Sequence, residues 1–126
     1  MDFELTNRQK QIRLAAREFA EGELVPIGKE CEAKGEFPRD LIKKAAQLGF
    51  VGVYIKKEYG GLGLGSLEHS LILEEFWRAE PGLGQIFSQT TFGAQELLLY
   101  GSEEQKKKYL PPLVKGDWVI GFAITE

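Results

Sequence analysis

The apolar residues of this chain recur mostly every three or four positions, which is the spacing of amphipathic helices. The first such segment begins at Thr6, whose hydroxyl makes it a natural N-cap. Its apolar face consists of Ile12, Ala16, Phe19 and Ala20, and Arg8, Lys10, Arg17, Glu18 and Glu21 face away. Gly22 weakens this pattern and Pro26 interrupts it, so we expect a second helical piece that ends at about Ala33.

A further helix is predicted from Pro38, which suits a first helical position, to Gly49, which suits a stop. The next residues, 50–55, are rich in β-branched and aromatic side chains and predict an extended segment that Gly52 interrupts. A glycine-rich loop, 60–65, then leads into another helix, for which Ser66 is the expected N-cap.

The helix that starts at Ser66 is expected to pack its apolar side against the bundle and to turn Glu75 outward. That apolar side consists of Leu67, Leu71, Leu73, Phe76 and Trp77. After Pro81 and Gly82, residues 83–100 are predicted to form one segment, in which small uncharged polar residues interrupt the apolar ones. They either bond back to the carbonyls of a core helix or form a partly buried contact surface.

The last helix has a clear start, because Ser102 and Gln105 form a capping box. Pro111 and Pro112 are predicted to end it, since neither can donate a backbone N–H. Residues 118–125 then have the composition of a buried strand. A single strand needs neighbours that this chain does not contain, so we expect the chain to be a piece of a longer protein.

Composition places the chain among globular proteins of one-domain size, with 126 residues, 43% hydrophobic and 28% charged. A formal net charge of −3 argues against non-specific binding of nucleic acid. No run is long and apolar enough for a membrane span, and the acidic N-terminus does not predict a signal peptide. A cytoplasmic protein is therefore the expectation.

Few residues of the sequence are candidates for catalysis or for binding a metal or a phosphate. Cys31 stands between two glutamates, which do not favour a reactive thiolate, and a single cysteine fits a reducing compartment. His69 is the only histidine and has no partner at ligand spacing, so we expect no metal site and a solvent or local hydrogen-bond environment for its ring. The glycine loop lacks the spacing of a phosphate-binding motif. Glu74 and Glu75 are adjacent, point in different directions on a helix and make no catalytic pair.

Several stretches together resemble the acyl-CoA dehydrogenases, the flavoenzymes that desaturate acyl-CoA thioesters. They are the glycine loop from Tyr59 to Leu64, the block from Gly101 to Pro111 that contains Ser-Glu-Glu-Gln-Lys and Tyr-Leu-Pro, and the final Phe-Ala-Ile-Thr-Glu of residues 122–126. The resemblance implies an all-α N-terminal helical domain at residues 1–117. It also implies that residues 118–126 are the first strand of a flavin-binding β-domain, cut inside its motif.

The resemblance implies FAD as cofactor, with Phe122 beside the ring, Ile124 in backbone contact and the Thr125 hydroxyl at the pyrimidine end. It places Gln85, Ser88, Gln89 and Phe92 in the wall of the pocket for the acyl-CoA substrate. No catalytic residue is expected in this chain, because the family's base is a carboxylate far beyond Glu126. Electrons would pass to an electron-transferring flavoprotein, and the parent would be a homo-oligomer, commonly a tetramer.

Two other interpretations are open. The parent could be an acyl-CoA oxidase or a flavin monooxygenase of the same fold, with the discriminating residues outside this chain. The chain could instead be a non-enzymatic helical interaction module whose last strand adds to the sheet of a partner protein. On the first and favoured interpretation, the isolated chain is inactive.

Overall fold

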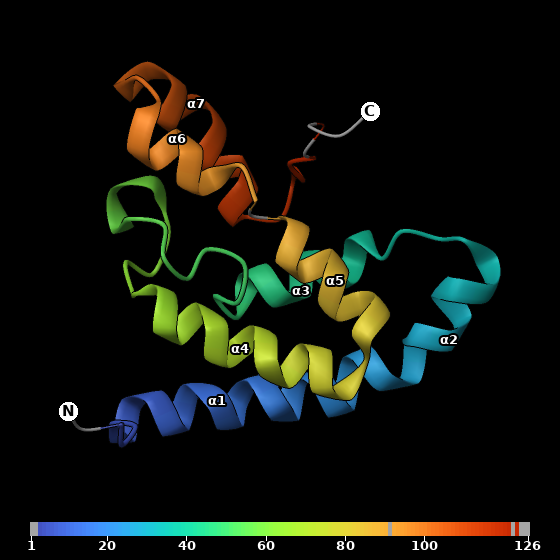
Figure 1. The fold of residues 1–126 in the computed structure, drawn as a ribbon. Coiled ribbons are helices and arrows are strands. Elements are labelled where there is room, and N and C mark those ends of the chain that lie inside the picture. Colours follow the sequence, from blue (N-terminus) through green and yellow to red (C-terminus); the bar gives the residue numbers. More distant parts are fainter. Residues whose placement is uncertain (1–2, 91, 122, 124–126) are drawn as a thin grey trace.

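The computed structural model describes residues 3–90, 92–121 and 123, and its regular structure is helical throughout these residues. Helices α1 (Asn7–Phe19) and α4 (Ser66–Ala79) lie side by side, and α5 (Pro81–Thr90) packs against α4 (Figure 1). Helices α6 (Ala94–Tyr100) and α7 (Glu103–Val114) pair on the opposite side of the molecule from α1. The all-α prediction is confirmed.

The N-terminal helical segment begins as the sequence predicts. Thr6 accepts a hydrogen bond from Gln9 N, and the Gln9 side chain accepts one from Thr6 N, which completes a capping box. Beyond α1, one π-helical turn (Ala20–Leu24) carries Gly22 and continues directly into α2 (Val25–Lys34). Pro26 stands at the junction between this turn and α2, and because it has no N–H it leaves one carbonyl of the preceding turn without an intrahelical partner.

Helix α3 (Arg39–Gln47) is followed by a buried segment that contains Val51, Val53 and Ile55. The expected extended conformation is not found: residues 51–55 form a series of bends and no strand among the described residues, and the glycine loop folds back on them. Leu62 N donates to Gly52 O, Leu64 N to Val53 O and Gly63 N to Ile55 O. A short 3-10 turn (Lys57–Tyr59) joins the two arms, so the loop is a structural element.

Three expectations for α4 are wrong. Gly65, not Ser66, is the N-cap, because Glu68 at the third helical position accepts a hydrogen bond from Gly65 N at 2.9 Å. Glu75 does not face outward: it is only 1% exposed, and α1 covers it with arginines. The broad apolar surface is also narrower than expected, because Leu67 and Trp77 are 51% and 42% exposed.

The predicted segment 83–100 is two helices, α5 and α6, which are separated near Gly93. A Cβ on Gly93 would stand 2.7 Å from Ile120 Cγ2, so the C-terminal segment packs closely against this break. Gly93 therefore stands at a turn between two helices, which the apolar spacing alone did not reveal.

Pro111 and Pro112 do not end the last helix, since α7 runs through them to Val114. Their missing N–H groups leave free only the carbonyls of Lys107 and Lys108, two exposed residues whose carbonyls water can reach. Leu110 and Leu113 are fully buried and hold the last turn in place. After α7, residues 118–121 form neither helix nor strand, and the rest of the expected strand lies mostly outside the described residues.

The core has two parts. The larger lies between α1, α3, α4 and α5 and includes a set of packed rings, Phe19, Phe50, Phe76 and Phe87. The smaller joins the loop residues Ile55 and Tyr59 to α6 and α7. None of the described helices is long and apolar enough to cross a membrane.

Candidate functional site

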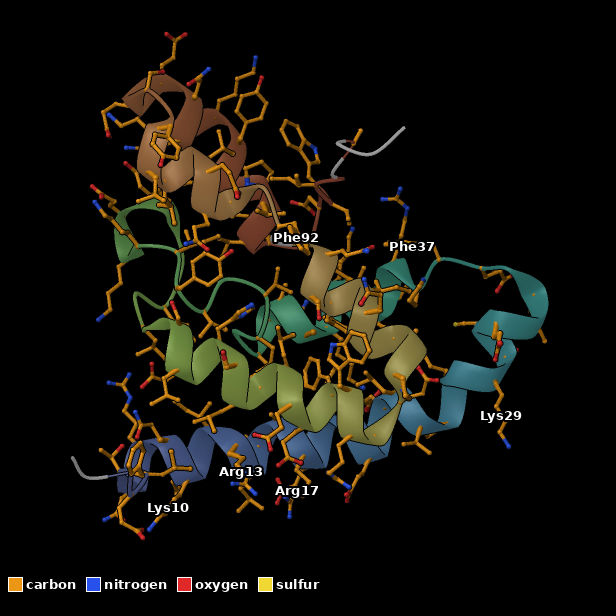
Figure 2. The ribbon with its side chains drawn as sticks, in the orientation of Figure 1. Lys10, Arg13, Arg17, Lys29, Phe37 and Phe92 are labelled. Atoms are coloured by element: carbon orange, nitrogen blue, oxygen red, sulfur yellow. The ribbon has the colours of Figure 1, made fainter. Side chains whose placement is uncertain are left out.

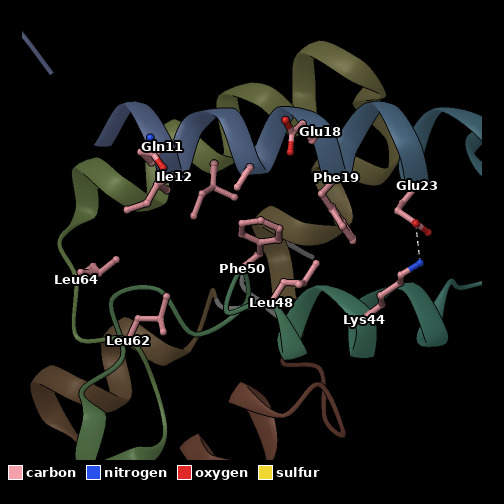
Figure 3. Close-up of a pocket in the computed structure, with 12 residues that line it drawn as sticks. Gln11, Ile12, Glu18, Phe19, Glu23, Lys44, Leu48, Phe50, Leu62 and Leu64 are labelled. Carbon is pink, nitrogen blue, oxygen red and sulfur yellow. Dashed lines mark hydrogen bonds and ion pairs between the residues drawn. The ribbon is translucent and has the colours of Figure 1, made fainter. Parts of the chain in front are cut away.

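An open groove of about 590 Å³ lies between α1, α3 and the glycine loop (Figure 3). Phe19, Phe50 and Ile12 form its floor, and the exposed side chains of Leu48 and Leu62 stand at its edge. The rim carries charged groups, among them Glu18 of α1 and Glu23 of the π-helical turn. Glu23 accepts a hydrogen bond from Lys44 Nζ at 2.6 Å. An apolar floor with a charged rim suits an apolar side chain from another protein.

A second cavity, of about 280 Å³, lies at the C-terminal end of α5. It brings together two of the four expected pocket-wall residues, Gln89 and Phe92. Its other walls come from the loop after α2, from α5 itself and from the segment after α7, through Phe37, Ile86, Val119, Ile120 and Gly121. The sequence reasoning missed Phe37; the only signal for it was an aromatic residue in a polar loop beside a proline.

The other two expected wall residues do not line this cavity. Ser88 Oγ accepts a hydrogen bond from Trp77 Nε1 at 2.8 Å and donates one to Gly84 O at 2.9 Å. Ser88 therefore bonds back to its own helix, as one of the two interpretations of these polar residues expects. Gly84 allows this contact between α4 and α5, because a Cβ there would stand 2.9 Å from Trp77 Cα. Gln85 is half-buried on the same helix.

The three residues that the resemblance assigns to FAD, Phe122, Ile124 and Thr125, lie outside the described residues. Of the described residues that precede them, Val119, Ile120 and Gly121 line the cavity that Gln89 and Phe92 also line. Gly121, the last described residue before Phe122, thus lines the same cavity as two of the expected acyl-pocket residues, Gln89 and Phe92.

His69 does not have the expected environment. Its ring stands edge-on to Tyr54, with centroids 5.0 Å apart, and its buried Nδ1 has no hydrogen-bond partner. Burial lowers the pKa of His69 from 6.5, so the ring is neutral at physiological pH. Among the described residues no cluster of histidine, cysteine, aspartate or glutamate could hold a metal ion.

The glycine loop also has no phosphate-binding geometry. Its backbone N–H groups at Leu62, Gly63 and Leu64 are used by the buried segment 52–55. A Cβ on Gly61 would stand 2.0 Å from Ile55 O, so this glycine is needed for the close approach of two chain segments. The loop shapes the groove of Figure 3 through Leu62 and Leu64.

Comparison with known proteins identifies the family of the chain. The family description "Acyl-CoA dehydrogenase, N-terminal domain" matches residues 6–117. A 3-(aryl)acrylate reductase of Clostridium sporogenes is 42% identical over 96% of this chain, and a short-chain specific acyl-CoA dehydrogenase of Clostridium acetobutylicum is 40% identical over all of it. The chain spans about a third of the length of these relatives, 32% and 34%.

Solved structures share the fold. A chain in a structure described as an electron transferring flavoprotein of Acidaminococcus fermentans matches with a TM-score of 0.86 and 39% identity, covering 94% of this chain and 32% of that one. An acyl-CoA dehydrogenase complexed with FAD from Bacillus anthracis matches with a TM-score of 0.86 and 34% identity, covering 92% and 20%. The chain therefore belongs to the acyl-CoA dehydrogenase family.

Proposed function

We propose that this chain is the N-terminal helical part of an FAD-dependent enzyme that introduces or removes the α,β double bond of acyl-CoA thioesters. The observation that carries the proposal is the cavity at the end of α5, which Gln89 and Phe92 line beside the segment that leads to Thr125. The division into a helical domain, 1–117, and the start of a β-domain, 118–126, is part of the same proposal, as are the roles of Phe122, Ile124 and Thr125.

The residues of this chain would bind and shield the substrate. Phe92 and Ile86 provide apolar walls that exclude water from the acyl group, and the Gln89 amide can orient a polar part of it. FAD, when bound, would accept a hydride from the acyl β-carbon. No described residue is placed to act as the base, so we propose that the carboxylate that takes the α-proton is supplied by a later part of the parent protein.

The names of two relatives indicate opposite directions of the reaction, since one is a reductase and the other a dehydrogenase. We take the dehydrogenase as the main proposal, with the reductase as the second candidate because that relative has the higher identity. The oxidase and monooxygenase alternatives differ from both in their use of oxygen.

For the dehydrogenase, the partner would be an electron-transferring flavoprotein, and we propose the groove of Figure 3 as its docking surface. The groove offers an apolar floor and an exposed Leu62 at its edge. Replacing Leu62 with aspartate should slow electron transfer to the flavoprotein and leave flavin reduction by substrate unchanged. Equal slowing of both steps would argue against this surface. We also propose that the parent protein is cytoplasmic and forms a homotetramer.

The first test is an absorption spectrum of the full-length gene product, purified without added cofactor. A flavin spectrum that bleaches when an acyl-CoA is added without oxygen would support the dehydrogenase. If bleaching requires a separate reductant and an enoyl-CoA restores the colour, the reductase is the better account. Rapid reoxidation by oxygen would favour the oxidase. A colourless protein that FAD does not reconstitute would leave the helical interaction module.

A further inference from the structure

The cavity at the end of α5 is walled by two phenyl rings from different parts of the chain. Phe37 comes from the loop between α2 and α3, and Phe92 follows the last turn of α5; both are labelled in Figure 2. The remaining walls are mainly aliphatic: Ile86, Val119 and Ile120. Among the described residues that line it, none is charged, and Gln89 has the only polar side chain.

Both rings keep a large part of their surface uncovered. Phe37 is 45% exposed and Phe92 is 46% exposed, although the core of the molecule buries other phenylalanines almost completely. Exposed rings that face a shared cavity offer apolar surface to a ligand without the cost of rearranging the core. The guanidinium of Arg39 lies over the ring of Phe37, 5.8 Å from the ring centroid, and favours the position of the ring through a cation–π contact.

The size and shape of the cavity favour a compact ligand group. Its volume is about 280 Å³. An apolar cavity of about 150 Å³ already holds benzene, so this cavity accommodates a phenyl ring with its short linker. A butyryl chain would leave part of the space empty, and the lining would then lose contacts.

We propose that the cavity selects a ring-bearing acyl group, such as a 3-phenylpropanoyl group, and that Phe37 is a specificity-determining residue for it. The proposal rests on the proposed function, since it concerns the acyl end of the same thioester. The ring of the substrate inserts between Phe37 and Phe92, where edge-to-face contacts reward an aromatic group over an aliphatic one of similar area. Gln89 lies beside this position and faces the linker.

The test compares 3-phenylpropanoyl-CoA with butyryl-CoA on the full-length flavoprotein, with steady-state reduction of an added dye, which accepts the electrons of the reduced flavin in the absence of oxygen, as the readout. The wild-type protein should have a higher kcat/KM for the phenyl substrate. Replacing Phe37 with alanine should lower the ratio of the two kcat/KM values by about tenfold, mainly through KM, because one aromatic contact and its buried area are lost. Phe37→Leu should lower the ratio by less.

Phe3→Ala is the matched control, because Phe3 is also an exposed phenylalanine, at 85%, and precedes α1 away from this cavity. Circular dichroism melts of all variants show whether each one folds. A ratio that Phe37→Ala leaves within twofold of the wild type, or a wild-type preference for butyryl-CoA, overturns the proposal while the proposed function stands. A protein that responds to neither thioester in either direction overturns both.

Discussion

Arg17 binds the carboxylate of Glu75 through two hydrogen bonds, from Nε to Oε2 at 2.9 Å and from Nη2 to Oε1 at 2.8 Å. Arg13 Nε donates to Oε1 at 2.9 Å, and Arg78 Nε donates to Oε2 at 2.8 Å. One buried carboxylate of α4 thus receives guanidinium groups from α1 and from its own helix. This joins the two helices that hold the larger part of the core.

Glu75→Gln should destabilise the chain by about 2 kcal/mol. Removing one member of a buried ion pair costs about 3–5 kcal/mol, and the cost is smaller here because the arginines are partly exposed and can turn to water. The side chains of Arg13 and Arg17 are 40% and 39% exposed. Urea unfolding measures the change. Glu74→Gln, at the exposed neighbouring position, is the control and should have almost no effect.

The same cluster predicts a loss of stability in acid. Hydrogen bonds from Arg17, then from Arg78 and Arg13, lower the pKa of Glu75 from 4.5 to about 2 despite its burial. Because the folded pKa is below the unfolded one, this stabilisation is complete above about pH 4.5 and is lost as pH falls through 2. Unfolding free energies measured between these values should show a steeper decline in the wild type than in Glu75→Gln. Parallel curves would contradict this.

His69 predicts a second, milder acid effect at higher pH. Burial against Tyr54 lowers its pKa below 6.5, so the unfolded chain binds the proton more tightly than the folded one. Stability should therefore be complete above pH 6.5 and should fall as pH decreases below it. His69→Phe should remove this dependence. Since His69 is the only histidine, its ring signals in NMR give the folded pKa directly, and a value above 6.5 would contradict the prediction.

Tyr59 links the loop to α7 and predicts an alkaline effect. Its hydroxyl donates to Glu103 Oε2 at 2.8 Å, and this bond is the main reason that the pKa of Tyr59 is raised from 10.0 to about 12. The stabilisation is complete below pH 10 and is lost as pH rises through 12. Tyr59→Phe should cost about 1 kcal/mol, the usual net value of one hydrogen bond. Tyr100→Phe, at an exposed tyrosine, serves as the control, and equal losses in both variants would rule out the bond as the cause.

How far the sequence could predict this structure depends on the range of the interactions. The N-cap at Thr6, the capping box at Ser102 and the stop at Gly49 are local, and the structure confirms them. The environment of Glu75 was predicted wrongly because it depends on arginines of α1, which is far away in the sequence. The role of Ser88 was left open because it depends on Trp77, which lies on another helix. Phe37 was missed for the same reason, since its cavity exists only when the loop, α5 and the C-terminal segment meet.

Two glycines allow a sharp test of the packing between the buried segment and the glycine loop. A Cβ at Gly61 would stand 2.0 Å from the carbonyl oxygen of Ile55, a backbone atom that cannot move without shifting the segment. Gly61→Ala should therefore cost more than about 2 kcal/mol, as backbone clashes in packed regions do. At Gly22, in the π-helical turn, a Cβ meets nothing within 4 Å. Gly22→Ala should stabilise the chain by about 0.5–1 kcal/mol, because alanine loses less backbone entropy in a helix. Thermal melts of the two variants should move in opposite directions, and a neutral Gly61→Ala would show that the loop can detach from Ile55 at little cost.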